Sequence, residues 1–146
     1  MKNILLIGGS QGIGLTIIEQ LLETHKIFVA SRSNESLNHD NITHLPFDVT
    51  KDELDLSRLP EELDGFVYCP GSINLKPFKM MSMDTFTEDM QLNFFCLVKV
   101  VKSIIGRMSD DSSMVFFSTV AVGTGMPFHT SVAAAKGAIE GFAKSM

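Results

Sequence analysis

The sequence predicts an α/β fold with a doubly wound parallel sheet of five strands. Three observations predict it: short apolar runs alternate with helical patterns, no repeat or linker interrupts the alternation, and a glycine-rich turn follows the first apolar run. Parallel strands joined through helices are expected because the right-handed crossover is the favoured way back to the sheet. We expect the strand order 3-2-1-4-5 in a single domain over residues 1–146.

The expected strands are short runs rich in apolar residues. The first of them, NILLIG, is continuously apolar, which is typical of a strand that is buried on both faces of a parallel sheet. The others contain the β-branched and aromatic residues that fit a pleated surface. The strands are expected at residues 3–8, 26–31, 43–47, 65–69 and 114–118.

Helical spacing of apolar residues fills the intervals between these strands. A first helix is expected directly after the turn that follows residue 8. A long amphipathic helix is expected over residues 83–108, with Ser82 or Asp84 available as its N-cap. One more helix follows Pro127. The apolar positions of the first helix are Ile13, Ile17, Ile18, Leu21 and Leu22.

Composition and charge exclude several classes of function. A chain of 146 residues with 45% hydrophobic residues can bury one core. Its net charge of −5, with scattered Lys and Arg, argues against a nucleic-acid partner. No apolar run reaches the roughly 20 residues of a membrane span, and the N-terminal run is too short for a signal peptide, so we expect a cytoplasmic protein. The two cysteines lack metal-ligand spacing, and we expect reduced thiols and no metal site.

The strongest motif is the turn GGSQGIG at residues 8–14, between the first strand and the first helix. Gly8, Gly12 and Gly14 permit a tight turn and let a pyrophosphate approach backbone N–H groups at a helix N-terminus, where the helix dipole favours an anion. The alternative is a glycine-rich turn without a ligand. Because the motif lies directly between a buried strand and a helix, it predicts dinucleotide binding in a Rossmann-like domain.

The ends of the second and third strands indicate which dinucleotide is bound. An acid after the second strand would bind the 2′-hydroxyl of the adenosine ribose, but the chain has Ser31 and Arg32, which suit a 2′-phosphate. The pair favours NADP(H) over NAD(H), although Arg32 could also be an ordinary solvated arginine. Asp48, after the third strand, could accept a hydrogen bond from an adenine amino group or simply cap the segment that follows.

With these motifs placed, the chain resembles the short-chain dehydrogenase/reductase family over essentially its whole length. GGSQGIG resembles the family's glycine motif, FDV its adenine-contact motif and YCPG its turn after the fourth strand. QLNFFCLV carries Asn93 at the family's helix asparagine, and Lys136 stands at the lysine of the Tyr-x-x-x-Lys motif. The cofactor-binding residues that the resemblance implies are Gly8, Ser10, Gln11, Gly12, Ile13, Gly14, Ser31, Arg32, Asp48, Val49, Cys69, Pro70, Gly71 and Lys136.

The same resemblance implies hydride transfer between nicotinamide and a ketone or alcohol, with a tyrosine phenol exchanging the proton. It implies that Asn93 and Lys136 act beside that tyrosine, Lys136 by binding the nicotinamide ribose and lowering the pKa of the phenol. Val132 occupies the tyrosine position, four residues before Lys136, and Thr119 stands at the usual serine position. His129 is a possible substitute donor, since another branch of the family has its tyrosine seven residues before the lysine.

Three of these residues could instead have ordinary structural roles. Lys136 could be a surface lysine, Asn93 a hydrogen-bonded core asparagine and Thr119 an ordinary strand residue; in either reading Asn93 is expected to bond inward. The resemblance also implies two further strands and a substrate loop. We therefore expect the domain to be incomplete at its C-terminus, and the 146-residue chain itself to be inactive.

Three functions follow from these expectations. The first is a short-chain oxidoreductase that acts on a carbonyl or alcohol substrate through an atypical catalytic site. The second is a nucleotide-binding pseudo-enzyme, which the valine at position 132 favours. The third is an oligomerising scaffold, because the helices at 83–108 and 128–146 correspond to the family's subunit-pairing helices. The resemblance implies a homo-oligomer that associates through these helices.

Overall fold

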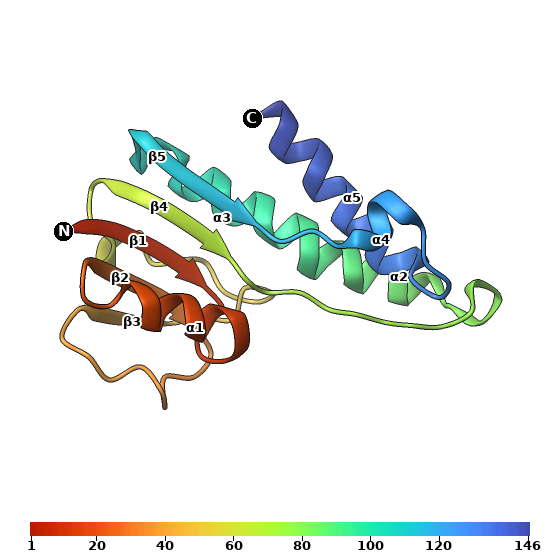
Figure 1. The fold of residues 1–146 in the computed structure, drawn as a ribbon, viewed down its shortest axis with the longest axis horizontal. Coiled ribbons are helices and arrows are strands. Elements are labelled where there is room, and N and C mark those ends of the chain that lie inside the picture. The colour runs from red at the N-terminus through yellow and green to blue at the C-terminus, as the bar shows by residue number, and fades with distance from the viewer. The chain divides into compact units, whose positions relative to one another are not determined.

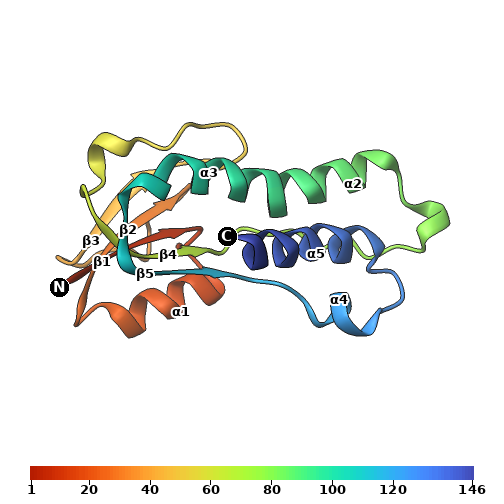
Figure 2. The ribbon, with the colours of Figure 1, turned by 90° about the horizontal axis from the view of Figure 1, so that it is seen from above.

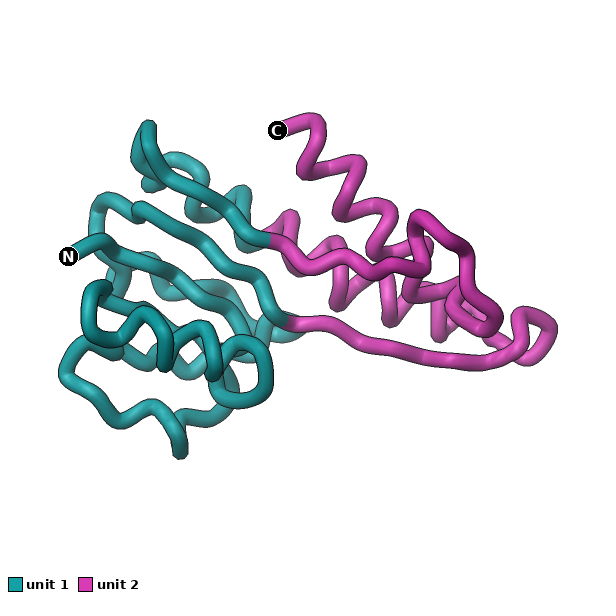
Figure 3. The backbone as a smooth tube through the Cα atoms, viewed as in Figure 1, with its two compact units in different colours: residues 1–69, 100–115 teal, residues 70–99, 116–146 magenta.

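A computed structural model describes all residues from 1 to 146. The chain divides into two compact units, coloured separately in Figure 3. Unit 1 comprises residues 1–69 and 100–115, and unit 2 comprises residues 70–99 and 116–146. The glycine-rich turn belongs to unit 1, whereas Asn93 and Lys136 belong to unit 2.

The sheet has five parallel strands in the order β3-β2-β1-β4-β5, which confirms the predicted fold class and strand order (Figure 1). The register places Ile4 of β1 beside Ile27 of β2 and Gly65 of β4. Parallel pairing puts the carboxyl ends of neighbouring strands at one edge, where ligands bind in open α/β sheets. The strands are β1 Lys2–Ile7, β2 His25–Ser31, β3 Ile42–Pro46, β4 Leu63–Tyr68 and β5 Met108–Phe116.

The core of unit 1 forms around the central strand. Leu5, Leu6 and Ile7 of β1 are buried, as expected for a continuously apolar strand with both faces covered. Helix α1, Gly12–Leu21, lies over one face and buries Ile18. The end of helix α3, Cys96–Ile104, lies over the other face and buries Ile104 (Figure 2). The short 3₁₀ turn η1, Leu56–Arg58, precedes β4.

The long helix expected over 83–108 is not one regular helix. Helix α2, Met83–Met90, continues through a π-helical turn η3, Gln91–Phe95, into α3, and a 3₁₀ turn η4, Ile105–Arg107, ends the run. Of the two expected N-caps, Ser82 and Asp84, the structure has Ser82. The helix stops early because Gly106 disfavours its continuation and Arg107 is anchored elsewhere. The Arg107 guanidinium donates to the carbonyls of Leu59 and Pro60, at 3.1 and 2.9 Å.

The prediction of a fifth strand at 114–118 was correct in existence but wrong in its bounds. The strand begins six residues earlier, at Met108, and ends at Phe116. Its first six residues, MSDDSS, lack the apolar run that revealed the other strands. Polar residues are tolerated there because β5 is an edge strand and none of its side chains is fully buried.

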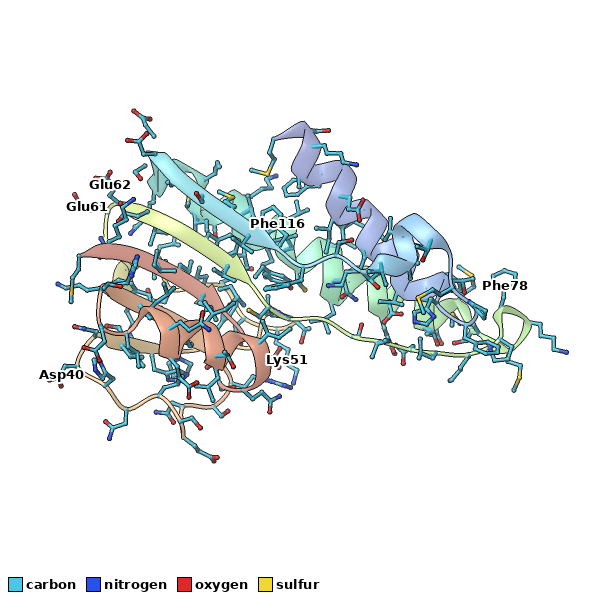
Figure 4. All side chains as sticks on the ribbon, in the orientation of Figure 1. Asp40, Lys51, Glu61, Glu62, Phe78 and Phe116 are labelled. Carbon is cyan, nitrogen blue, oxygen red and sulfur yellow. The ribbon has the colours of Figure 1, made fainter.

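Unit 2 is built mainly from helices. Helix α5, Thr130–Ser145, confirms the helix expected after Pro127, and it contacts α2 through a hydrogen bond of 3.3 Å from Ser131 Oγ to the Thr85 carbonyl. Phe142 of α5 packs edge-on against Phe94, and Phe116, labelled in Figure 4, also contacts it. The sequence did not reveal the 3₁₀ turn η2, Phe78–Met80, or the short helix α4, Val120–Thr124. Neither these helices nor those of unit 1 are long and apolar enough to cross a membrane.

Candidate functional site

The turn between β1 and α1 is shaped by glycine. Gly8 and Gly12 have φ values of 80° and 58°, in the left-handed region that side chains disfavour. Gly14 is required for a different reason: a Cβ there would lie 2.5 Å from Gly8 O and 2.9 Å from Gly9 Cα. Because these obstructing atoms belong to the backbone, the first turn of α1 can approach the strand end only with glycine at position 14.

Sequence reasoning missed Gly9 in the same turn. A Cβ at this position would lie 2.5 to 2.8 Å from side-chain carbons of Ile18, Leu6 and Val29. The backbone at Gly9 therefore packs directly on the core of unit 1. The tandem glycines at 8 and 9 were the available signal, but the G-x-x-x-G-x-G spacing assigns no role to the second of them.

The N-terminus of α1 is open to an anion. Its N-cap, Gln11, makes no side-chain capping hydrogen bond, and the first turn contains no acidic residue. Gln11, Gly12 and Ile13 are exposed, with 63% of Ile13 accessible, and Ser10 is half-buried. Unoccupied N–H groups and the positive end of the helix dipole favour a phosphate here.

The two residues predicted to read the ribose have different surroundings. Ser31 is buried; its hydroxyl donates to the Ser33 carbonyl at 2.7 Å and lies 3.1 Å from Nε2 of His44. His44 Nε2 is also 3.0 Å from the Ser31 carbonyl. Arg32 is exposed, and its guanidinium makes no hydrogen bond or ion pair within the chain. Of the pair, only Arg32 presents a free polar side chain.

Asp48 caps the turn that follows β3. Its Oδ1 accepts hydrogen bonds from Thr50 Oγ1, at 2.6 Å, and from Thr50 N, at 3.0 Å. The bonds from Thr50, with a smaller contribution from Lys51, lower the pKa of Asp48 below its ordinary value. Lys51 Nζ lies 3.6 Å from Oδ2 on the outside of unit 1 (Figure 4). The cap predicted as one alternative is present, and the neighbouring Val49 is buried.

Cys69 stands at the end of β4, where its N–H donates to the Ile7 carbonyl at 3.0 Å. Its Sγ would lie 3.3 Å from a Cβ at Gly14, so the end of β4 lies beside the glycine turn. Pro70 follows it and begins unit 2.

In unit 2, Asn93 and Lys136 meet at one face of Gly71. A Cβ at Gly71 would lie 3.1 Å from Asn93 Oδ1 and 3.4 Å from Lys136 Nζ. These residues come from three segments: the stretch after β4, the π-helical turn η3 and helix α5. The sequence resemblance named all three, and the structure brings them together.

Asn93 is completely buried and bonds inward, as expected. Its Nδ2 donates to the Asp89 carbonyl at 2.9 Å and to Ser72 Oγ at 3.0 Å. Asn93 lies within the π-helical turn η3, at the end of which the Cys96 N–H bonds to the Gln91 carbonyl. The side chain of Asn93 therefore bonds to the main chain one turn earlier in the same helical run.

Behind Asn93 is a carboxylate that sequence reasoning did not single out. Asp89 is fully buried on α2, and its Oδ1 accepts from Ser72 Oγ, at 2.5 Å, and from Asn74 Nδ2, at 2.8 Å. Its Oδ2 has no hydrogen-bond partner. The available signal was an acid on the same helical face as Asn93, four residues earlier.

The remaining predicted catalytic residues have structural partners of their own. Val132 is buried on α5, with 4% of its surface accessible. Thr119 is the N-cap of α4, and its hydroxyl accepts a hydrogen bond of 3.3 Å from Ala121 N. His129 is half-exposed at the start of α5, and its Nδ1 lies 2.7 Å from the Pro127 carbonyl. The ring of His129 is thus held by its own loop.

Comparison with known proteins gives one family. The sequence profile of the short chain dehydrogenase family matches residues 2–146. No curated protein gives a significant match.

Solved structures of this family have the same fold. A short chain dehydrogenase family protein from Francisella tularensis superposes with a TM-score of 0.87 and 22% identity, covering 99% of this chain and 62% of its own. A short chain dehydrogenase/reductase from Saccharomyces cerevisiae gives 0.86 and 22%, covering 99% and 64%. A 4-hydroxyisoleucine dehydrogenase complexed with NADH and succinate gives 0.79 and 22%, covering 98% and 71%. The chain thus spans less than two thirds of the length of the first two structures.

Proposed function

Because the chain belongs to the short-chain dehydrogenase family, whose members are oxidoreductases that use NAD(P)(H), we propose that it takes part in the NADP(H)-dependent interconversion of a ketone and an alcohol. The observation that carries this proposal is the meeting of Asn93 Oδ1 and Lys136 Nζ at Gly71. Side chains from distant segments converge on a glycine whose missing Cβ leaves room for both. A surface lysine on an alanine-rich helix would not need that arrangement.

Unit 1 would bind the phosphates and the adenosine. The glycine turn supports this because its backbone is bare at Gly12 and the N–H groups of the first turn of α1 are not capped by a side chain. Arg32 would pair with the 2′-phosphate by a charge-assisted hydrogen bond. Asp48 Oδ2 would accept a hydrogen bond from the adenine amino group, while the Thr50 hydroxyl donates to Oδ1.

Unit 2 would supply the groups around the nicotinamide ribose. A nicotinamide bound there would supply the chemistry of hydride transfer. Lys136 would hold the ribose hydroxyls, and Asn93 would present its carbonyl oxygen toward the same region. Thr119 would place a hydroxyl near the substrate oxygen. Val132 cannot exchange a proton, so the proton would come from another group, of which His129 is one candidate.

Nucleotide titration tests the cofactor assignment. We expect NADPH to bind this chain more tightly than NADH, and Arg32→Ala to remove most of the difference, because the charge-assisted pair contributes about 1.5–3 kcal/mol. Lys26→Ala is the matched control, since Lys26 is an exposed cation at the opposite end of the same strand. Calorimetry or nucleotide fluorescence gives the affinities. Equal affinities for the two nucleotides, unaffected by Arg32→Ala, would contradict the assignment.

Val132 favours a second function, a nucleotide-binding pseudo-enzyme in which the cofactor is a structural or regulatory ligand. Turnover of a carbonyl substrate distinguishes the pseudo-enzyme from the oxidoreductase. Both require NADPH binding, but only the oxidoreductase turns over a carbonyl in the longest form that the coding sequence encodes.

A further inference from the structure

The buried carboxylate of Asp89 has no role in the function proposed above. It is 0% exposed, it has no cationic partner in its hydrogen-bond network, and one of its two oxygens makes no hydrogen bond. Burying a carboxylate in this way opposes folding, because the charge loses its hydration and Oδ2 gains nothing in return. An apolar side chain at the same position would avoid that cost. What the carboxylate provides is a strict hydrogen-bond acceptor.

The direction of each hydrogen bond in this cluster follows from that acceptor. Ser72 has one hydroxyl proton, and it is donated to Asp89 Oδ1 at 2.5 Å. Ser72 Oγ can then only accept from Asn93, so the atom of Asn93 that faces it is Nδ2, at 3.0 Å. The Asp89 backbone carbonyl, also an acceptor, requires Nδ2 as well, at 2.9 Å.

The carbonyl oxygen of Asn93 is therefore left to face the other way. Asn93 Oδ1 accepts from Ser72 N at 3.4 Å and lies beside Gly71, the glycine that Lys136 Nζ also approaches. Asn74 Nδ2 donates to Asp89 Oδ1 at 2.8 Å, which ties the same segment to α2 a second time.

We propose that Asp89 is a positioning residue: its carboxylate fixes the Ser72 hydroxyl, and through it the orientation of the Asn93 amide, so that Asn93 Oδ1 lies beside Gly71, which Lys136 Nζ also approaches. The orientation of the Asn93 amide follows from the hydrogen bonds alone. Its consequence for the lysine rests on the proposed function, in which Lys136 holds the nicotinamide ribose. Asp89 acts through Ser72 and Asn93 and has no contact of its own with substrate or cofactor.

The first experiment measures the side-chain amide of Asn93 in the 146-residue chain by NMR. Asp89→Leu removes the carboxylate that accepts from Ser72. Ser72→Ala removes the hydroxyl that links this carboxylate to the Asn93 amide. In both variants we expect the Asn93 amide protons to exchange with solvent about tenfold faster. Asp89→Asn keeps a carbonyl oxygen in the place of Oδ1 and should retain slow exchange. Glu88→Leu, at an exposed neighbouring position of α2, is the control for the helix itself.

The second experiment separates the two halves of the cofactor. NADPH carries the nicotinamide ribose, whereas adenosine 2′,5′-bisphosphate lacks it. We expect Asp89→Leu and Ser72→Ala to weaken NADPH binding about tenfold and to leave the affinity for the bisphosphate unchanged. Asp89→Asn should restore NADPH binding to near the native affinity.

The outcomes distinguish the two proposals. If the native chain binds neither nucleotide, the proposed function fails, and the amide exchange rates still decide whether Asp89 positions Asn93. If Asp89→Leu does not fold, the amide exchange rate and the NADPH affinity are both measured in Ser72→Ala. Unchanged amide exchange in Ser72→Ala, or unchanged NADPH affinity in a variant whose amide exchange has accelerated, would overturn the positioning role.

Discussion

The glycine turn of unit 1 and the polar cluster of unit 2 are made in different ways. The turn is a backbone site: Gly8 and Gly12 adopt positive φ, and Gly14 leaves no room for a Cβ. The cluster is a side-chain site in which Asn93 and Lys136 come from segments more than 40 residues apart. A site made of backbone is recorded in one contiguous motif, whereas a site made of side chains becomes visible only after the chain folds.

The largest expected effect comes from restoring the missing phenol in unit 2. Val132→Tyr should raise ketone reduction by on the order of 10² to 10⁴, the usual contribution of a placed general acid, if Thr119 and Lys136 keep the family geometry. The measurement is carbonyl reduction in the longest form that the coding sequence encodes. Val132 is buried, so the larger ring should also cost about 1–3 kcal/mol of stability.

Two controls accompany that variant. Val132→Phe brings the same ring without the hydroxyl and should give the stability loss without the gain in rate. His129→Ala tests the substitute donor in the native background, because a histidine that delivers the proton cannot be removed without slowing reduction. Brisk reduction by the native protein that His129→Ala leaves unchanged would mean that another group donates the proton.

The second prediction concerns the backbone site. Gly14→Ala should destabilise unit 1 by about 1–3 kcal/mol or more and abolish nucleotide binding, because the added Cβ would meet Gly8 O at 2.5 Å and the backbone cannot move aside cheaply. Gly12→Ala meets no atom within 4 Å, so its cost is the left-handed backbone alone, about 1–2 kcal/mol. Thermal unfolding and NADPH titration give both quantities. A Gly14→Ala protein of native stability and affinity would contradict the close approach of α1 to the strand end.

These results bear on what sequence could predict. The positions of four strands were predictable because they are short runs rich in apolar residues, and the start of β5 was predicted six residues too far along the chain because its polar first half carries no such signal. The glycine turn was predictable except at Gly9, whose Cβ would collide with side chains from other elements. Asn93 and Lys136 were predictable only through family resemblance. Asp89 shares a helical face with Asn93, but nothing local to it specifies that Ser72 and Asn74 will donate to its carboxylate.

A third prediction tests the meeting point in unit 2. Gly71→Ala should weaken NADPH binding several-fold with little change in stability, since the Cβ would crowd Asn93 Oδ1 at 3.1 Å and Lys136 Nζ at 3.4 Å, distances that a small displacement relieves. Gly141→Ala is the control, because a Cβ there meets no atom within 4 Å and alanine favours the helix by up to about 1 kcal/mol. Calorimetric titration of both variants decides whether the crowding matters to the cofactor.

The smallest expected effect concerns Asp48, the acidic side chain among the candidate residues of the backbone-made site. The pKa of Asp48 is lowered chiefly by its hydrogen bonds from Thr50, and that of Asp55 is lowered in the same way by Ser57. A lowered pKa means that each cap stabilises the fold above the ordinary value of 3.8 and loses this effect as the pH falls through the lowered value. Thr50→Ala should therefore raise the pKa of Asp48 toward its ordinary value and leave Asp55 unchanged, as an NMR titration can measure.

Asp55 then serves as the internal reference for the cofactor role of Asp48. If Asp48 accepts from the adenine amino group, NADPH should lower its pKa further, because a hydrogen bond to the charged form favours that form, while Asp55 should not respond. If NADPH binds and leaves the pKa values of both Asp48 and Asp55 unchanged, Asp48 only caps the turn. The adenosine would then be held by backbone and by Arg32, and the contrast between a site made of backbone in unit 1 and one made of side chains in unit 2 would be sharper still.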